Sequence, residues 1–178
     1  MILKQNILST IEIRSMIQTD LPALEWDGTY THYRELFKST YQRVADQKGL
    51  AWLVEVPEKE IIGQVFIQLI CQRLELADGI TRAYLYSFRV KPKYRRLGIG
   101  KTLLDYCEND LIKRNIRFVT LNVSKDNELA IKLYKNRGYE IIASEPGIWQ
   151  YRDHQGVRHQ VIEPAWRMEK VLFEQSAI

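Results

Sequence analysis

Two arginines and two glycines stand together in the stretch "YRRLGIG", just before a segment with helical periodicity. Glycine lets the backbone adopt strained angles and lets a ligand approach closely. The unpaired N–H groups and partial positive charge of a helix start attract phosphate. Arg95 and Arg96 add forked, permanently charged donors that suit phosphate oxygens. The pattern predicts a phosphate or pyrophosphate site, although these four residues fit a turn with solvated arginines almost as well.

Two nucleotide-binding motifs fail at this position. A Walker A loop has the form G-x-x-x-x-G-K-[ST], and Arg95 stands where its first glycine is required. A dinucleotide fingerprint has the form G-x-G-x-x-G, and Leu103 replaces its last glycine. The spacing therefore argues against an unrelated nucleotide-binding protein of either kind.

The sequence predicts a strand before this turn and a helix after it. Arg82 to Val90 is rich in β-formers and Pro92 ends it, while Gly98 to about Asn115 has an apolar stripe at helical spacing. Asp20 is a candidate N-cap for a short first helix, and Gly49 is the predicted end of a second. The remaining predicted strands and helices are Ile11 to Met16, Thr31 to Gln47, Leu50 to Val56, Ile61 to Cys71, Arg117 to Val123, Asn127 to Arg137, "YEIIAS", a hairpin turning at Asp153 to Gly156, and Ala165 to Phe173.

This order of elements predicts an α/β (α+β) fold, in which helices pack on both faces of a mixed sheet. No linker divides the chain, so residues 1–178 are expected to form one domain, with frayed ends at 1–9 and 174–178. Hydrophobic residues make up 46% of the chain and charged residues 27%, which is ordinary for a globular protein.

The formal net charge of +4 suits an anionic ligand without requiring one. No Lys/Arg block indicates nucleic-acid binding, and no apolar run is long enough to span a membrane. Cys71 and Cys107 are expected to be buried, and no His or Cys spacing indicates a metal site. A cytoplasmic location follows by default.

The stretch "VKPKYRRLGIG" resembles the acetyl-coenzyme A signature [QR]-x-x-G-x-[GA] of the GCN5-related N-acetyltransferase (GNAT) family, with Arg95, Gly98 and Gly100 in its defined positions. A second stretch about 30 residues later, "LNVSKDNELAIKLYKNRGYE", resembles the family's other hallmark. The predicted elements follow the family from Ile11 to Phe173. The resemblance implies a mostly antiparallel GNAT sheet, acetyl-coenzyme A as co-substrate and no metal.

The resemblance also implies where the coenzyme lies. The pyrophosphate would contact the backbone of Arg96, Leu97, Gly98, Ile99, Gly100 and Lys101, with the Arg95 and Arg96 side chains beside it. The pantetheine would run along Phe88, Arg89 and Val90, where the family has a bulge. Asn127 would bond the pantetheine, and also fits as an N-cap. Tyr134 would give its proton to the leaving thiolate, although its spacing also fits a core aromatic.

The base and the acceptor are less defined. Many relatives carry a carboxylate on the central strand, where this chain has Tyr86, Ser87 and Phe88. Glu25, Asp27, Asn122 or a water chain through Ser87 or Tyr86 remain candidates for the base. The segments that contact the acceptor in the family are rich in aromatic residues, which suit a cationic amine or simply the core. The acceptor-side candidates are Trp26, Asp27, Tyr86, Ser87 and Tyr151.

The sequence therefore predicts an N-acetyltransferase acting on a primary amine, either a small molecule or a peptide. The alternative is a non-catalytic acyl-coenzyme A binding or sensing module on the same fold. The acceptor, the length of the acyl group, and the choice between monomer and homodimer stay open.

Overall fold

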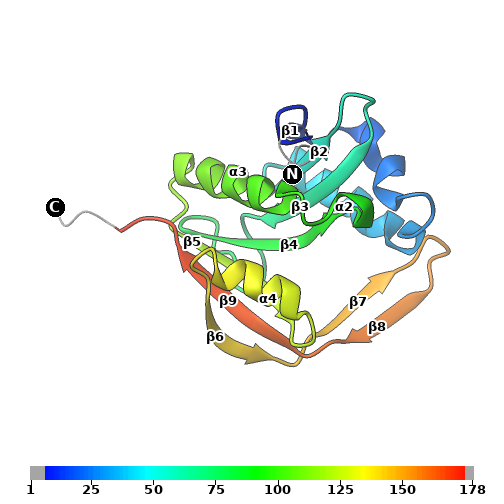
Figure 1. Ribbon diagram of the computed structural model, residues 1–178. Helices are drawn as coiled ribbons and strands as arrows, with labels where there is room; N and C mark the ends of the chain where they lie inside the picture. The colour runs from blue at the N-terminus through cyan, green and yellow to red at the C-terminus, as the bar shows by residue number, and fades with distance from the viewer. Residues whose placement is uncertain (1–6, 175–178) are drawn as a thin grey trace.

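The computed structural model describes residues 7–174, and seven of its strands form one sheet (Figure 1). The strand order across this sheet is β1-β2-β3-β4-β5-β9-β6. Its strands are β1 (Glu12–Ser15), β2 (Gly49–Glu55), β3 (Ile61–Gln68), β4 (Arg82–Val90), β5 (Phe118–Ser124), β6 (Glu140–Glu145) and β9 (Ala165–Val171). Every neighbouring pair is antiparallel except β4 and β5, which are parallel. The predicted mixed, mostly antiparallel sheet is confirmed.

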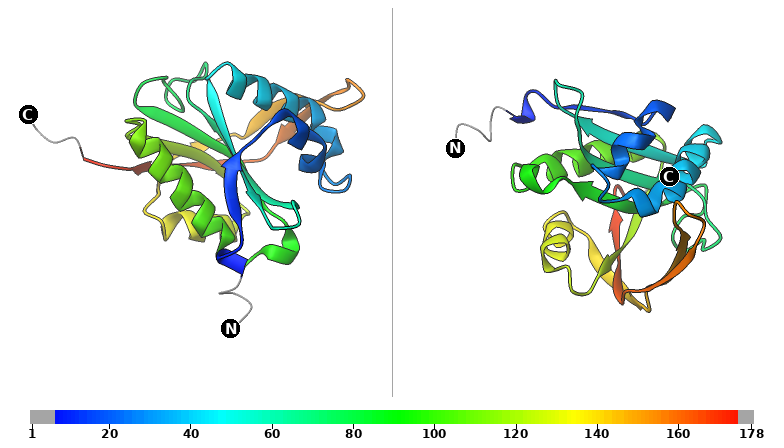
Figure 2. Two further views of the ribbon diagram at one scale, coloured as in Figure 1. Left: turned by 90° about the horizontal axis from the view of Figure 1, so that it is seen from above. Right: turned by 90° about the vertical axis from the view of Figure 1, so that its right-hand side faces the viewer.

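Helices cover both faces of this sheet (Figure 2). The helices are α2 (Arg34–Ala45), α3 (Ile99–Lys113) and α4 (Glu128–Lys135), with 3-10 helices η1 (Gln18–Glu25), η2 (Thr31–Tyr33) and η3 (Pro92–Tyr94). Alternate residues of β2 face opposite sides, as a pleated strand requires: Val54 joins the core under α3, and Leu53 joins the core under α2. The predicted apolar stripe of α3 is buried along its length.

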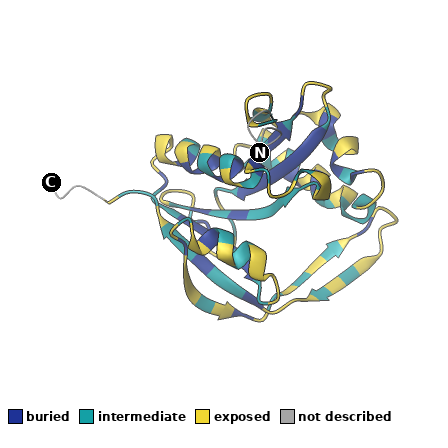
Figure 3. Cartoon of the chain, in the orientation of Figure 1, coloured by how far each residue is buried: buried dark blue, intermediate teal, exposed yellow. Residues whose placement is uncertain are grey.

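The remaining two strands, β7 (Ile148–Arg152) and β8 (Arg158–Ile162), form a separate hairpin. This hairpin projects from the sheet toward α2, and its strands alternate between partly and fully exposed residues (Figure 3). Tyr33 of η2 contacts its inner face, with ring centroids 5.0 Å from Tyr151 and 6.1 Å from Trp149. The predicted hairpin turn at Asp153 to Gly156 is confirmed.

Two predicted helix boundaries were wrong. Asp20 is not an N-cap, because the cap position is Ile17, whose N–H donates to the Asp20 carboxylate at 2.8 Å. Gly49 does not end a helix: α2 ends at Ala45 and Gln47 has the left-handed conformation. Gly49 begins β2 instead, where an added Cβ would lie 2.7 Å from the carbonyl oxygen of Ile67. Glycine is needed there because a neighbouring backbone approaches closely.

Strands β4 and β5 separate halfway along their length. Their pairing runs only from Arg82↔Phe118 to Leu85↔Leu121. Beyond it, the register between β3 and β4 gains one residue on β4, and Ser87 takes the left-handed conformation with φ 52°. A bulge bends its strand, so β4 leaves β5 at this point. The bulge predicted near Phe88 to Val90 is confirmed.

Fraying was expected at residues 1–9 and 174–178. Residues 1–6 and 175–178 lie outside the described residues, whereas residues 7–9 form a turn in which the Thr10 N–H donates to the Ile7 carbonyl at 3.0 Å. Ile7 packs against the core, so the expected fraying does not reach it. Among residues 7–174, no helix is long and apolar enough to cross a membrane.

Candidate active site

Two cavities meet where β4 and β5 separate. One, of about 740 Å³, is bounded by the turn before α3 and by α4, and we call it the α3–α4 cavity. The other, of about 850 Å³, is bounded by η2, α2 and the β7–β8 hairpin, and we call it the α2 cavity. Both are lined by Tyr86, Ser87, Arg89, Asn122, Ser124 and Glu163. The gap between the strands therefore joins a ligand space on one face of the sheet to one on the other.

Most of the predicted coenzyme residues line the α3–α4 cavity. They are Phe88, Arg89, Val90, Arg95, Arg96, Gly98, Gly100, Lys101, Asn127 and Tyr134. Leu97 and Ile99 do not line it, because their side chains pack against the core. Contact of their backbone with a pyrophosphate stays a prediction.

The turn before α3 has the features of an anion site. Gly98 caps α3 in the left-handed conformation, with φ 93°. Arg96 and Lys101 are exposed beside the first turn of the helix. Gly100 faces Phe88, whose ring would lie 3.4 Å from an added Cβ. Free N–H groups, a missing side chain and nearby cations together fit a pyrophosphate.

Asn127 caps α4, because its Oδ1 accepts a hydrogen bond from the Ala130 N–H at 3.1 Å. The amide nitrogen of the same side chain remains a donor, and Asn127 lines the α3–α4 cavity. The capping role and the expected contact with a pantetheine arm are therefore compatible.

Tyr134 lies on α4 and lines the α3–α4 cavity, although only 5% of the residue is exposed. Its ring lies 6.2 Å from that of Phe88 and 5.5 Å from that of Tyr139. Burial raises the pKa of Tyr134 well above its ordinary value. The hydroxyl therefore keeps its proton at neutral pH and is suited to donate it.

The predicted acceptor residues separate into two groups. Tyr86 and Ser87 line both cavities, and the Tyr86 hydroxyl lies 3.1 Å from Thr40 Oγ1. Trp26, Asp27 and Tyr151 line neither. Trp26 is buried against Tyr30, Asp27 is exposed in a turn, and Tyr151 stacks on His159 behind the cavity wall.

Glu163 is the site residue that the sequence did not reveal. It lies between β8 and β9, and its backbone N–H donates to the Gly147 carbonyl at 3.0 Å. Its side chain makes none of the ion pairs found among residues 7–174, and it is exposed at the junction of the cavities. Only its position before Pro164, at a strand boundary, could have drawn attention to it. Of the earlier base candidates, Glu25 is bound to Arg34 and lines neither cavity.

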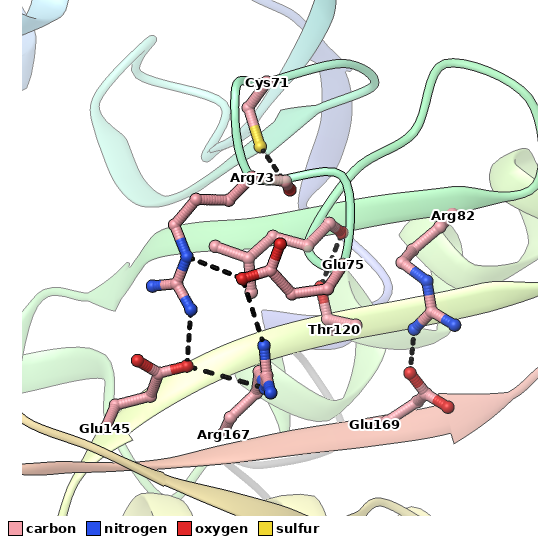
Figure 4. Close-up of polar contacts among 9 residues, drawn as sticks. Cys71, Arg73, Glu75, Arg82, Thr120, Glu145, Arg167 and Glu169 are labelled. Atoms are coloured by element: carbon pink, nitrogen blue, oxygen red, sulfur yellow. Dashed lines mark hydrogen bonds and ion pairs between the residues drawn. The ribbon is translucent and has the colours of Figure 1, made fainter.

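Four charged side chains near the α2 cavity pair with one another (Figure 4). Arg73, in the loop between β3 and β4, contacts Glu145 at 2.7 Å and Glu75 at 2.8 Å, and Arg167 of β9 lies 3.5 Å from the same two carboxylates. This network attaches the loop to β6 and β9. Cys71 in the same loop is only partly buried, contrary to expectation, and its thiol donates to the Arg73 carbonyl; Cys107 is buried.

Gly147 holds Glu163 in place, and its replacement by alanine is expected to be costly. Its φ is 64°, and an added Cβ would lie 1.7 Å from the Glu163 carbonyl oxygen. Because backbone must move to relieve that contact, Gly147→Ala should lower the free energy of unfolding by about 3 kcal/mol. Chemical denaturation would measure it.

Gly156→Ala is the matched control, since Gly156 has φ 84° but nothing within 4 Å of its added Cβ. Gly156→Ala should lower the free energy of unfolding by only about 1 kcal/mol, because alanine is disfavoured in the left-handed conformation. Equal losses in the two variants would show that the close contact with Glu163 is not what constrains Gly147.

Comparison with known proteins identifies the family of this chain. The sequence profile of the Acetyltransferase (GNAT) family matches residues 13–139. The chain therefore belongs to the GNAT family, as its two motifs indicated.

Two curated relatives are N-terminal acetyltransferases by name. The catalytic subunit naa20 of the N-terminal acetyltransferase B complex of Schizosaccharomyces pombe is 32% identical over 89 residues, which is 50% of this chain and 49% of that protein. The N-alpha-acetyltransferase daf-31 of Caenorhabditis elegans is 29% identical over 99 residues, covering 54% and 52%. The match thus spans about half the length of each relative.

Solved structures share the fold. The ribosomal-protein-S18-alanine N-acetyltransferase of Escherichia coli superposes with a TM-score of 0.71 at 22% identity, covering 94% of this chain and 98% of that one. Ard1 of Thermoplasma volcanium gives 0.70 at 21% identity, covering 93% and 99%.

Proposed function

We propose that the protein is an N-acetyltransferase that transfers the acetyl group of acetyl-coenzyme A to an amine. The observation that carries the proposal is the meeting of the two cavities at the β4–β5 gap. The α3–α4 cavity has the cationic turn and the buried tyrosine, and the α2 cavity opens onto the same gap from the opposite face. Coenzyme and acceptor can then approach each other from opposite sides of the sheet.

The residues at the gap fit the steps of direct transfer. The thioester supplies an activated acetyl group, the amine nitrogen bonds to its carbonyl carbon, and the C–S bond breaks. Tyr134 donates its proton to the departing sulfur. Holding both reactants in one geometry supplies much of the acceleration. Glu163, at the junction, accepts the proton that the amine loses, directly or through water.

Release of free thiol in the presence of a library of amines tests the proposal. Acetyl-coenzyme A and the protein should release thiol only with certain amines, and mass spectrometry should show those amines 42 Da heavier, the mass of an acetyl group less one hydrogen. Coenzyme binding without thiol release for any amine would favour the non-catalytic binding module instead.

Glu163→Gln should lower kcat/KM at neutral pH by about 100-fold, because the amine then loses its proton to bulk water. The loss should shrink as the pH rises toward the pKa of the acceptor amine, where neutral amine becomes abundant. A pH–rate profile from pH 6 to about 10 would measure both effects.

Glu140→Gln is the control for Glu163→Gln, since Glu140 is exposed on β6 and lines neither cavity. It should leave the profile unchanged. A Glu163→Gln loss that stays constant across the pH range would contradict the role as a base.

A further inference from the structure

Arg89 points its side chain into the α2 cavity. It lies on β4 two residues after the bulge at Ser87, between Phe88 and Val90. Phe88 and Val90 face the start of α3, since both contact the position of an added Cβ on Gly100. Successive side chains of a strand alternate between faces, so Arg89 faces the other side of the sheet. There its guanidinium lies 4.2 Å from the ring centroid of Tyr30 and 5.1 Å from that of Tyr33.

The charge of Arg89 lacks a counter-charge. Within residues 7–174, its Nη1 atom is buried and has no hydrogen-bond partner, and no carboxylate forms an ion pair with it. Gln64 lies opposite Arg89 in the β3–β4 register, but its amide is neutral and donates toward Ser87. Burial lowers the pKa of Arg89 from its ordinary value, opposed only by Tyr30 and Tyr33. Stacking on aromatic rings compensates only part of the cost of burying a charge.

Two other arginines near the cavity, the exposed Arg73 and the partly buried Arg167, do have counter-charges. Arg73 and Arg167 each lie within 3.5 Å of the Glu145 and Glu75 carboxylates. A guanidinium that stacks on two tyrosines, lines a cavity and keeps an unpartnered donor is suited to bind a planar anion. Phosphates of the coenzyme are not that anion, because the cationic turn that suits them lies on the opposite face of the sheet.

We propose that Arg89 binds a carboxylate of the acceptor, so that the protein acetylates amines that also carry a carboxylate. This inference rests on the proposed function and specifies its substrate class. Arg89 and Glu163 then supply opposite charges to one acceptor, the guanidinium holding the carboxylate while the amine lies at the junction beside Glu163. The carboxylate is either the α-carboxylate of a free amino acid or an acidic side chain next to a peptide amine.

The first experiment compares acceptors with and without that charge. Free α-amino acids are compared with their carboxamides, and Ala-Asp-Ala-amide with Ala-Asn-Ala-amide, using thiol release. The carboxylate member of at least one kind of pair should have a kcat/KM about tenfold or more above that of its neutral partner. A preference among the amino acids would identify the α-carboxylate as the group bound, and a preference among the peptides would identify the acidic side chain. Equal or better turnover of the neutral members in both kinds would overturn the inference.

Variants of Arg89 test whether this residue causes the preference for carboxylate acceptors. Arg89→Gln should reduce the ratio of carboxylate to neutral turnover to about one, and Arg89→Lys should retain part of it, because an ammonium keeps the charge but loses the fork. Arg158→Gln is the control, since it removes the same charge from the exposed face of β8. An Arg89→Gln variant that slows both members of a pair equally would contradict the inference.

A binding measurement separates this inference from the proposed function. With coenzyme A present, so that no transfer occurs, the preferred amino acid or peptide class should raise the melting temperature of the wild type but not of Arg89→Gln. If coenzyme A stabilises the protein but no amine is acetylated, the proposed function is refuted. The melting-temperature shift with the carboxylate ligands would still show whether Arg89 binds a carboxylate. No additional shift with any of these carboxylates would overturn the inference.

Stability of the free protein gives a second readout. If Arg89 served only to tie Tyr30 and Tyr33 together, Arg89→Met would lower the melting temperature. If it is instead a charge held ready for a ligand, replacing it with an apolar side chain of similar length should leave the melting temperature unchanged or raise it. A clear decrease in Arg89→Met, with the acceptor preference unaffected, would assign Arg89 a structural role.

Discussion

Replacing Tyr134 with phenylalanine is expected to lower kcat about 100-fold while leaving the affinity for coenzyme A within about threefold of the wild type. The phenylalanine ring keeps the contacts with Phe88 and Tyr139 and loses only the hydroxyl. The factor lies at the low end for a general acid because a thiol, with an ordinary pKa of about 8.5, is already a fair leaving group. Steady-state thiol release gives kcat, and titration calorimetry with coenzyme A gives the affinity.

The pH dependence of Tyr134 follows from its burial. Its pKa lies above the ordinary value, so the proton-bearing form persists as the pH rises, and the hydroxyl should remain a donor throughout the range up to about pH 10. No fall in kcat below that pH should therefore come from Tyr134. A decline that disappears in Tyr134→Phe would contradict this assignment.

Tyr139→Phe is the matched control for Tyr134→Phe. Tyr139 is buried next to Tyr134, but it does not line the α3–α4 cavity, and its hydroxyl faces Glu108. The loss of that hydroxyl should change stability rather than kcat. If Tyr134→Phe turns over at the wild-type rate, Tyr134 is not the acid, whatever Tyr139→Phe does.

Reversing the charge of both Arg96 and Lys101 to glutamate is expected to abolish stabilisation by coenzyme A. In the wild type, coenzyme at 100 times its Kd should add about 2.7 kcal/mol of stability, because it binds only the folded state. For a chain of this size that corresponds to a rise of about 5–10 °C in Tm. The double variant places two carboxylates beside the proposed pyrophosphate site and should show no rise. Thermal unfolding at increasing coenzyme concentration measures the Tm shift of the wild type and of the double variant.

The choice of these two positions follows from the structure. Gly98 has φ 93°, so a glutamate there would strain the backbone, and Arg95 Nε donates to the Val90 carbonyl at 2.9 Å. Arg96 and Lys101 are exposed and can be changed with less effect on folding. Lys113→Glu with Arg158→Glu reverses the same number of exposed charges away from the cavity and should retain the shift. A wild type that shows no shift at millimolar coenzyme would refute the coenzyme site itself.

The local features of the fold could be predicted because a few neighbouring residues decide them. The end of a strand before Pro92, the glycine that begins α3 and the apolar stripe of α3 each depend on residues that are close in the sequence. The family motifs extend these local features to the coenzyme. The error at Gly49 has the opposite cause, since glycine is required there by the backbone of Ile67, a residue distant in the sequence.

The arrangement of the site depended on contacts that no short stretch contains. The separation of β4 from β5 comes from pairing between strands, and the facing of Arg89 depends on the one extra residue of the bulge at Ser87. Glu163 reaches the junction because the hairpin returns the chain to Gly147. Trp26 and Asp27 had suitable residue types, yet the fold places them away from both cavities.

The sequence by itself determined the family, and it predicted the coenzyme turn and the role of the α4 tyrosine, because each rests on residue types at fixed short spacings. Only the tertiary structure decided which face of the sheet each side chain of β4 occupies, and therefore which charges an acceptor would meet. A strand residue changes face with a shift of a single position, and that position is fixed by pairing with strands far away in the chain.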